Sequence, residues 1–184
     1  DHGYGTDGRW IWFSAHHPGL GAEIYRMPRE GGTAERLDLP APSWFHGVSP
    51  DGAEIVYAAA RGGARVIDIW AAPFSGGAER QLTHGEGQAD GPEFSACGRR
   101  IYFNTARDGQ AQIWVMAADG AGQRPLFQDA RVNWFPHPAP GGRHLIWLSY
   151  PEGTTGHPRD RPVKIMLGDT EGDVRRVNVR ATEI

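Results

Sequence analysis

The fold is decided by the stretch Ser95-Ala96-Cys97-Gly98-Arg99-Arg100-Ile101-Tyr102-Phe103-Asn104, followed by Gln112-Ile113-Trp114-Val115-Met116. It combines a glycine turn with two apolar runs of strand length, and the same unit occurs four times. The four copies align when their turn pairs are placed in register: Asp7-Gly8, Asp51-Gly52, Cys97-Gly98 and Gly141-Gly142. The separations of about 44, 46 and 44 residues lie in the range typical of repeat architectures.

Every copy contains short apolar and aromatic runs separated by glycine-rich turns, and none has an apolar period of about 3.6 residues. A β-helix would need shorter repeats, and helical repeats would need the missing period. Four short strands per copy are typical of a β-propeller blade. We therefore predict an all-β protein with a single β-propeller domain over residues 1–184, made of four complete four-stranded blades at approximately 1–40, 41–83, 84–127 and 128–184.

The closure of the ring follows less directly from the repeat. Each copy begins with its innermost strand and ends with its outermost strand, so neither end of the chain is left over to complete a shared blade. We expect the four blades to be part of a larger ring, or to close by forming a homo-oligomer. A tight four-bladed ring is the third alternative.

The composition excludes several classes of partner. The formal net charge of −3 and the absence of a dense run of Lys or Arg exclude a general attraction to nucleic acid. No apolar stretch approaches the roughly 20 residues that span a bilayer. The single Cys97 excludes an intrachain disulfide framework and a zinc cluster of thiolates. The sequence starts at Asp1 without a recognisable leader, so its compartment cannot be read directly.

Candidate site residues gather at one face of the predicted propeller. The connections into the innermost strands and the loops between second and third strands emerge at the same mouth of the channel. At these positions stand the following residues: His2, Trp44, His46, Asp90, Glu93, Trp134, His137, His157, Arg159 and Asp160. They predict a polar ligand-binding site, while the plainer interpretation is that they hold neighbouring blades together.

A metal site is a further hypothesis for the same face. His2, His46 and His137, with Asp90 or Glu93, offer the imidazole and carboxylate ligands that suit divalent metals. Their spacing is the spacing of the repeat, and it lacks the close pairing of strong zinc motifs. Beyond this divalent metal, we expect no cofactor.

Several of these segments carry a resemblance to a known family. They are Asp1-His2-Gly3, Trp44-Phe45-His46-Gly47, Asp90-Gly91-Pro92, Trp134-Phe135-Pro136-His137-Pro138 and Gly156-His157-Pro158-Arg159-Asp160. Together with Ser49-Pro50-Asp51-Gly52 and Asp68-Ile69-Trp70, the sequence resembles TolB-like β-propeller repeat proteins, in particular a bacterial group of uncharacterised six-bladed propellers. The resemblance implies a six-bladed ring, a periplasmic location and a binding role in a cell-envelope complex. The sequence departs from the repeat at Cys97 and Gly141, where the pattern usually has Asp.

Two functions remain open at this point. The first is a binding or scaffold propeller whose channel-mouth face takes a protein segment or a small ligand. The alternative is a metal-dependent lyase of acidic oligosaccharides, in which His46 or His137 would abstract a proton and Arg159 or Arg161 would hold the acid. No nucleophile elbow or phosphate-binding loop is present, which argues against hydrolysis by a Ser or Cys nucleophile. The lyase needs a closed pocket and a specific ligand set that the sequence does not identify residue by residue, so the sequence favours binding.

Overall fold

The structure is a computed structural model that describes residues 2–63 and 66–171, together with the backbone of residues 174–179. The predicted boundaries at residues 1 and 184 lie outside the described residues. Within the described part of the chain every element is a β-strand, and the strands form four antiparallel sheets. The all-β, four-bladed prediction is confirmed.

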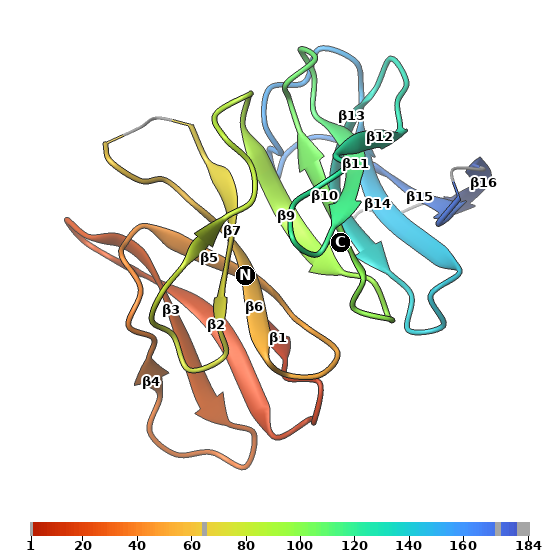
Figure 1. The fold of residues 1–184 in the computed structure, drawn as a ribbon. Coiled ribbons are helices and arrows are strands. Elements are labelled where there is room, and N and C mark those ends of the chain that lie inside the picture. The colour runs from red at the N-terminus through yellow and green to blue at the C-terminus, as the bar shows by residue number, and fades with distance from the viewer. Residues whose placement is uncertain (1, 64–65, 172–173, 180–184) are drawn as a thin grey trace.

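Each sheet contains four strands that are consecutive in the chain. Figure 1 shows where the resulting blades lie. The first blade contains β1 (His2–Tyr4), β2 (Trp10–His17), β3 (Gly21–Pro28) and β4 (Glu35–Arg36). The second contains β5 (Ser43–Val48), β6 (Glu54–Ala59), β7 (Asp68–Pro73) and β8 (Arg80–Gln81). The third contains β9 (Ala89–Phe94), β10 (Arg100–Thr105), β11 (Gln112–Ala117) and β12 (Arg124–Phe127). The fourth contains β13 (Val132–Pro138), β14 (His144–Tyr150), β15 (Lys164–Asp169) and β16 (Val174–Val179).

The turns between the first two strands of each blade use the glycine pairs that the repeat places in register. Gly8, Gly52, Gly98 and Gly142 all have φ between 65° and 72°. This left-handed conformation is strained for residues with a Cβ atom, which explains why glycine stands at this position in every copy. The hairpins can therefore be predicted from local sequence.

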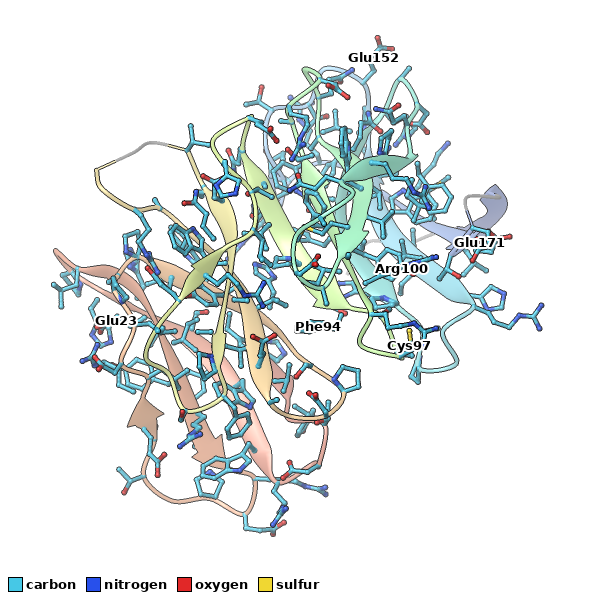
Figure 2. All side chains as sticks on the ribbon, viewed as in Figure 1. Glu23, Phe94, Cys97, Arg100, Glu152 and Glu171 are labelled. Atoms are coloured by element: carbon cyan, nitrogen blue, oxygen red, sulfur yellow. The ribbon has the colours of Figure 1, made fainter. Side chains whose placement is uncertain are left out.

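The core lies between neighbouring blades rather than inside any one sheet. Trp12 of the first blade stacks on Phe45 of the second with ring centroids 5.5 Å apart, and Phe127 of the third stacks on Trp147 of the fourth at 4.3 Å. Between the second and third blades lies a cluster that includes Phe94, which Figure 2 labels. Burying one such side chain stabilises the fold by about 1.5–3 kcal/mol, so each blade depends on its neighbour.

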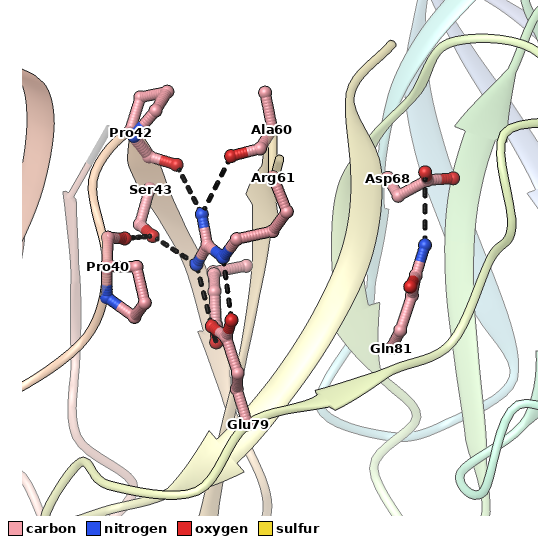
Figure 3. Close-up of polar contacts among 9 residues, drawn as sticks. Pro40, Pro42, Ser43, Ala60, Arg61, Asp68, Glu79 and Gln81 are labelled. Atoms are coloured by element: carbon pink, nitrogen blue, oxygen red, sulfur yellow. Dashed lines mark hydrogen bonds and ion pairs between the residues drawn. The ribbon is translucent and has the colours of Figure 1, made fainter. Parts of the chain in front are cut away.

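A largely buried ion pair stabilises the second blade. The Arg61 guanidinium donates two hydrogen bonds of 2.7 Å to the Glu79 carboxylate and a third to the carbonyl of Pro42 (Figure 3). The guanidinium also lies 5.2 Å from the Trp70 ring centroid, which is within cation–π range. Burial raises the pKa of Glu79, but the hydrogen bonds from Arg61 and Tyr57 outweigh it and leave the pKa below its ordinary value.

The four blades are arranged as an arc in chain order (Figure 1). Strands of the first blade pack against the second, and strands of the third pack against the second and fourth. Among the described residues, no strand pair from the first and fourth blades makes comparable contact. A larger ring and closure by oligomerisation both stay predictions. No helix long and apolar enough to cross a membrane occurs in the described ranges.

Candidate functional site

The candidate site lies at the channel mouth, where the innermost strands β5, β9 and β13 run side by side. β9 contacts both of the other two strands. In all three blades the pairing between the innermost strand and its neighbour shifts register, for example between Phe45 and Gly47 and between Trp134 and His137. Such bulges redirect side chains and commonly accompany functional sites. The simple alternation of a strand is therefore broken where the candidate residues stand.

His46 of β5 and Asp90 of β9 form an ion pair across the junction of the second and third blades. His46 Nε2 lies 3.0 Å from Asp90 Oδ1, and the two side chains are only 10% and 13% exposed. The backbone N–H of Gly91 donates a 2.8 Å hydrogen bond to the same Oδ1 atom of Asp90. The structure thus brings together two of the predicted residues in a largely buried position.

The electrostatics of Asp90 favour a charged carboxylate. Burial raises its pKa, but the hydrogen bond and charge of His46 lower it, as do the N–H of Gly91 and the charge of His157. The net result is a pKa below the ordinary value for aspartate. A largely buried carboxylate paired with an imidazole is a polar centre that can orient a ligand.

Aromatic rings surround this polar centre. The Phe135 ring lies parallel to His46 at a centroid distance of 6.2 Å. The ring of His157, in the long loop between β14 and β15, packs edge to face against the rings of Trp134 and Phe135. Both centroid distances are 4.9 Å. The structure therefore places the loop histidine against the rings of Trp134 and Phe135.

Phe135 and Asn104 are contributors that sequence reasoning missed. Phe135 has φ of 56°, a conformation that is uncommon for a residue with a Cβ atom. Its backbone N–H donates a 3.0 Å hydrogen bond to Oδ1 of Asn104, whose side chain is fully buried. The signal was available, because Asn104 interrupts an apolar run and stands at the same repeat position as Ser14. The hydroxyl of Ser14 accepts the equivalent N–H of Phe45 at 2.8 Å.

His137 and Glu93 form a second, separate pair. The Nδ1 atom of His137 contacts Oε1 of Glu93 closely, with side-chain exposures of 56% and 26%. The hydrogen bond to Glu93 raises the pKa of His137 above its ordinary value, although burial partly opposes this. The pair links β9 to β13 nearer the solvent than the pair of His46 and Asp90 does.

The remaining predicted residues take no part in these contacts. Trp44 is half-buried on β5, His2 is exposed on β1, and Arg159 and Asp160 are exposed in the β14–β15 loop. Within the described residues, none of these four side chains forms a hydrogen bond, an ion pair or a ring contact with His46 or Asp90. The structure thus divides the predicted set into a central cluster and a periphery.

The three histidines of the metal hypothesis do not converge. In the part of the chain that the structure describes, no three or more His, Cys, Asp and Glu side chains form a group that could hold a metal ion. His46 and His137 are each engaged by a different carboxylate. The geometry therefore gives the metal hypothesis no support.

A cavity of about 360 Å³ opens beside the cluster, between the β10–β11 turn and the β14–β15 loop. Trp134 lines it together with the amide side chains of Gln88 and Gln110. The backbone N–H of Gly153 donates a 3.2 Å hydrogen bond to Oε1 of Gln110, which connects the β14–β15 loop to the third blade. A cavity of this size accommodates a small ligand or a few residues of a peptide.

No family model matches the chain. An uncharacterised protein of Agrobacterium fabrum is 40% identical over 172 residues, which cover 94% of this chain and 58% of the relative. The Tol-Pal system protein TolB of Anaeromyxobacter dehalogenans is 34% identical over 119 residues, or 62% of this chain and 26% of that protein. The chain thus spans less than two thirds of the length of these relatives.

Solved structures agree with the sequence relatives. A structure from Agrobacterium tumefaciens, whose assignment as TolB is provisional, has a TM-score of 0.90 at 40% identity and covers 96% of this chain and 63% of its own. TolB of Acinetobacter baumannii has a TM-score of 0.79 at 17% identity, covering 97% and 43%, and shows the shared fold alone. By sequence and fold, the chain therefore matches part of a TolB-like β-propeller.

Proposed function

We propose that the channel-mouth face of this propeller is a binding surface for a protein segment or a small ligand. The observation that carries the proposal is the cluster around the pair of His46 and Asp90, with its aromatic wall and the adjoining cavity of about 360 Å³. A rigid, largely buried polar centre flanked by apolar rings provides both orientation and contact area.

A protein segment is the occupant that the family resemblance favours. The Tol-Pal system protein TolB is among the relatives, and the resemblance to TolB implies a role in a cell-envelope complex. We place the protein in the periplasm as part of the same proposal. No observation among the described residues favours the lyase alternative, and the solved oligogalacturonate lyase with manganese, at 13% identity, shares the fold alone.

Site-directed photo-crosslinking tests this proposal. In one variant of the chain, a photoreactive amino acid replaces Gln110, which lines the cavity. In a second variant it replaces Ala139, which lies in a turn on the opposite face. Both are irradiated with a periplasmic extract of Agrobacterium. We expect one protein to be captured from Gln110 and not from Ala139.

The captured protein is then purified and its affinity is measured by calorimetry. His157→Ala removes an exposed ring of the cluster, and His144→Ala removes an exposed histidine at the other end of β14 as a matched control. We expect His157→Ala to weaken binding at least about threefold, as for the loss of one aromatic contact, and His144→Ala to leave it unchanged. Equal capture from both faces, or equal affinity of both variants, would refute the proposal.

A further inference from the structure

A second cleft lies on the face opposite the channel mouth. It has a volume of about 410 Å³ and is formed by the β9–β10 turn, the β13–β14 turn and the turn after β15. Three arginines line it: Arg99, Arg100 and Arg143. Figure 2 shows Cys97 and Arg100 at this end of the third blade, with Glu171 beside Arg100. The cleft is therefore unusually rich in guanidinium groups.

The repeat explains how this charge arises. In the first blade, Asp7 precedes Arg9 by two residues in the β1–β2 turn. The Asp7 carboxylate accepts 2.9 Å hydrogen bonds from both the backbone N–H and the side-chain Nε of Arg9. The backbone N–H and the charge of Arg9 hold the pKa of Asp7 below its ordinary value. The arginine of the first turn is thus neutralised within its own turn.

The third and fourth blades keep the arginine but lack the aspartate. Arg99 follows Cys97, and Arg143 follows Gly141, at the offset that separates Arg9 from Asp7. Among the described residues, neither Arg99 nor Arg143 forms an ion pair within 4.0 Å. Two neighbouring turns therefore each direct an exposed arginine, outside the ion pairs of the described residues, to the same cleft.

Among the described residues that line the cleft, one carboxylate faces these arginines. Glu171 is the carboxylate that lines the cleft, and it lies 3.9 Å from Arg100 with its side chain 79% exposed, an arrangement that contributes little. Asp51 and Glu54 line a neighbouring cleft on the other side of Arg99. Glu54 pairs with Arg80 at 3.1 Å, and Asp51 accepts hydrogen bonds from its own turn.

Cys97 lies at the edge of the cleft, in a turn that favours an anion. In the second blade the Ser49 hydroxyl donates to the Asp51 carboxylate at 2.6 Å. The equivalent Ser95 hydroxyl lies 3.5 Å from the Cys97 sulfur. This contact, and then the backbone N–H and charge of Arg99, lower the pKa of the exposed Cys97 thiol. The thiol is a local sensor of the charge in the cleft.

We propose that this cleft binds a small polyvalent oxyanion, namely the phosphate or polycarboxylate group of a soluble ligand, through Arg99, Arg100 and Arg143. Guanidinium groups bind such oxyanions with paired, charge-assisted hydrogen bonds. The volume of about 410 Å³ matches that of sites for small molecules. This site lies on the face of the propeller opposite the channel mouth, so each of the two proposals can be tested independently of the other.

The reactivity of Cys97 provides the test, because it is the single cysteine of the chain. The rate of alkylation by neutral iodoacetamide is measured near pH 7 with pyrophosphate, with citrate, or with sodium chloride at matched ionic strength. A bound anion offsets the field of the arginines and raises the pKa of the thiol, and each unit of increase slows alkylation about tenfold. We expect pyrophosphate or citrate to slow alkylation at least about threefold relative to chloride, and their order to identify the preferred oxyanion.

Variants separate specific binding from general screening by salt. Arg99→Gln and Arg143→Gln each remove one exposed guanidinium from the cleft, and Arg29→Gln removes an exposed guanidinium from the first blade as a control. We expect protection to be lost in the first two variants and retained in the third. No protection by either oxyanion, or equal protection in all three variants, would overturn the proposal.

Discussion

Replacing Gly91 by alanine tests how tightly the channel-mouth cluster is packed. Gly91 has φ of 61° and lies where β9 meets the fourth blade. A Cβ atom added there would lie 2.9 Å from Oδ1 of Asn104, 2.9 Å from Cδ1 of Phe135 and 3.2 Å from the Phe135 backbone. The added methyl would therefore push apart the two residues whose hydrogen bond positions the aromatic wall.

The magnitude follows from comparison with a second glycine. Gly62 has the same φ of 61°, but a Cβ atom added there would meet nothing within 4 Å. Gly62→Ala therefore carries only the cost of the left-handed conformation, about 1–2 kcal/mol. Gly91→Ala adds overpacking against backbone and side chain, which costs about 1–3 kcal/mol more. We expect Gly91→Ala to lower the free energy of unfolding by about 2–5 kcal/mol in total.

Urea unfolding followed by tryptophan fluorescence measures both values. The informative quantity is the difference between Gly91→Ala and Gly62→Ala, because the shared backbone cost cancels. A difference of about 1–3 kcal/mol supports the packing described. An equal loss of stability in the two variants would show that the junction accommodates a methyl group and would refute the reasoning.

Two further predictions concern charged pairs. Arg61→Ala leaves Glu79 without its partner at a largely buried position and should lower the free energy of unfolding by about 2–4 kcal/mol in urea titrations; a loss below about 0.5 kcal/mol would contradict this. Glu93→Gln should lower the melting temperature more at about pH 5.5 than at about pH 9. Since Glu93 raises the pKa of His137 above its ordinary 6.5, its stabilising effect is complete below pH 6.5 and is lost as pH rises through the raised pKa. An effect independent of pH would contradict the second prediction.

The blades could be predicted from sequence because their signals are local. A hairpin needs a glycine turn and two apolar runs, and both are present within about 20 residues in each copy. Gly52 and Gly98, for example, adopt the left-handed φ that their place in the repeat requires. The apolar runs beside them provide the faces that pack between blades, so fold class and blade number follow together.

The partners within the site could not be predicted in the same way. The sequence indicates that His46, Asp90, Glu93 and His137 share one face, but their pairing depends on how adjacent blades are rotated and on where each innermost strand bulges. A register shift between Trp134 and His137 separates His137 from the buried pair. Such shifts depend on packing between sheets, which no local pattern encodes.

The repeat itself shows why the buried charge lies between the second and third blades. At the first and third junctions, a polar side chain of the preceding blade accepts an N–H from the next innermost strand: Ser14 from Phe45, and Asn104 from Phe135. The second blade has Ala58 at this position, and alanine offers no side-chain acceptor.

At that junction Asp90 supplies the missing acceptor from its own strand. The N–H of Gly91, which is equivalent to those of Phe45 and Phe135, donates to the Asp90 carboxylate. A buried carboxylate requires a partner, and His46 provides one. The loss of an acceptor at Ala58 is thus coupled to the gain of a charged pair at the channel mouth. The same logic applies on the opposite face, where loss of the turn aspartate at Cys97 and Gly141 exposes arginine charge. In both places the candidate site lies where copies depart from the repeat, because the loss of a repeated polar residue places a charged side chain at a position where it can contact a ligand.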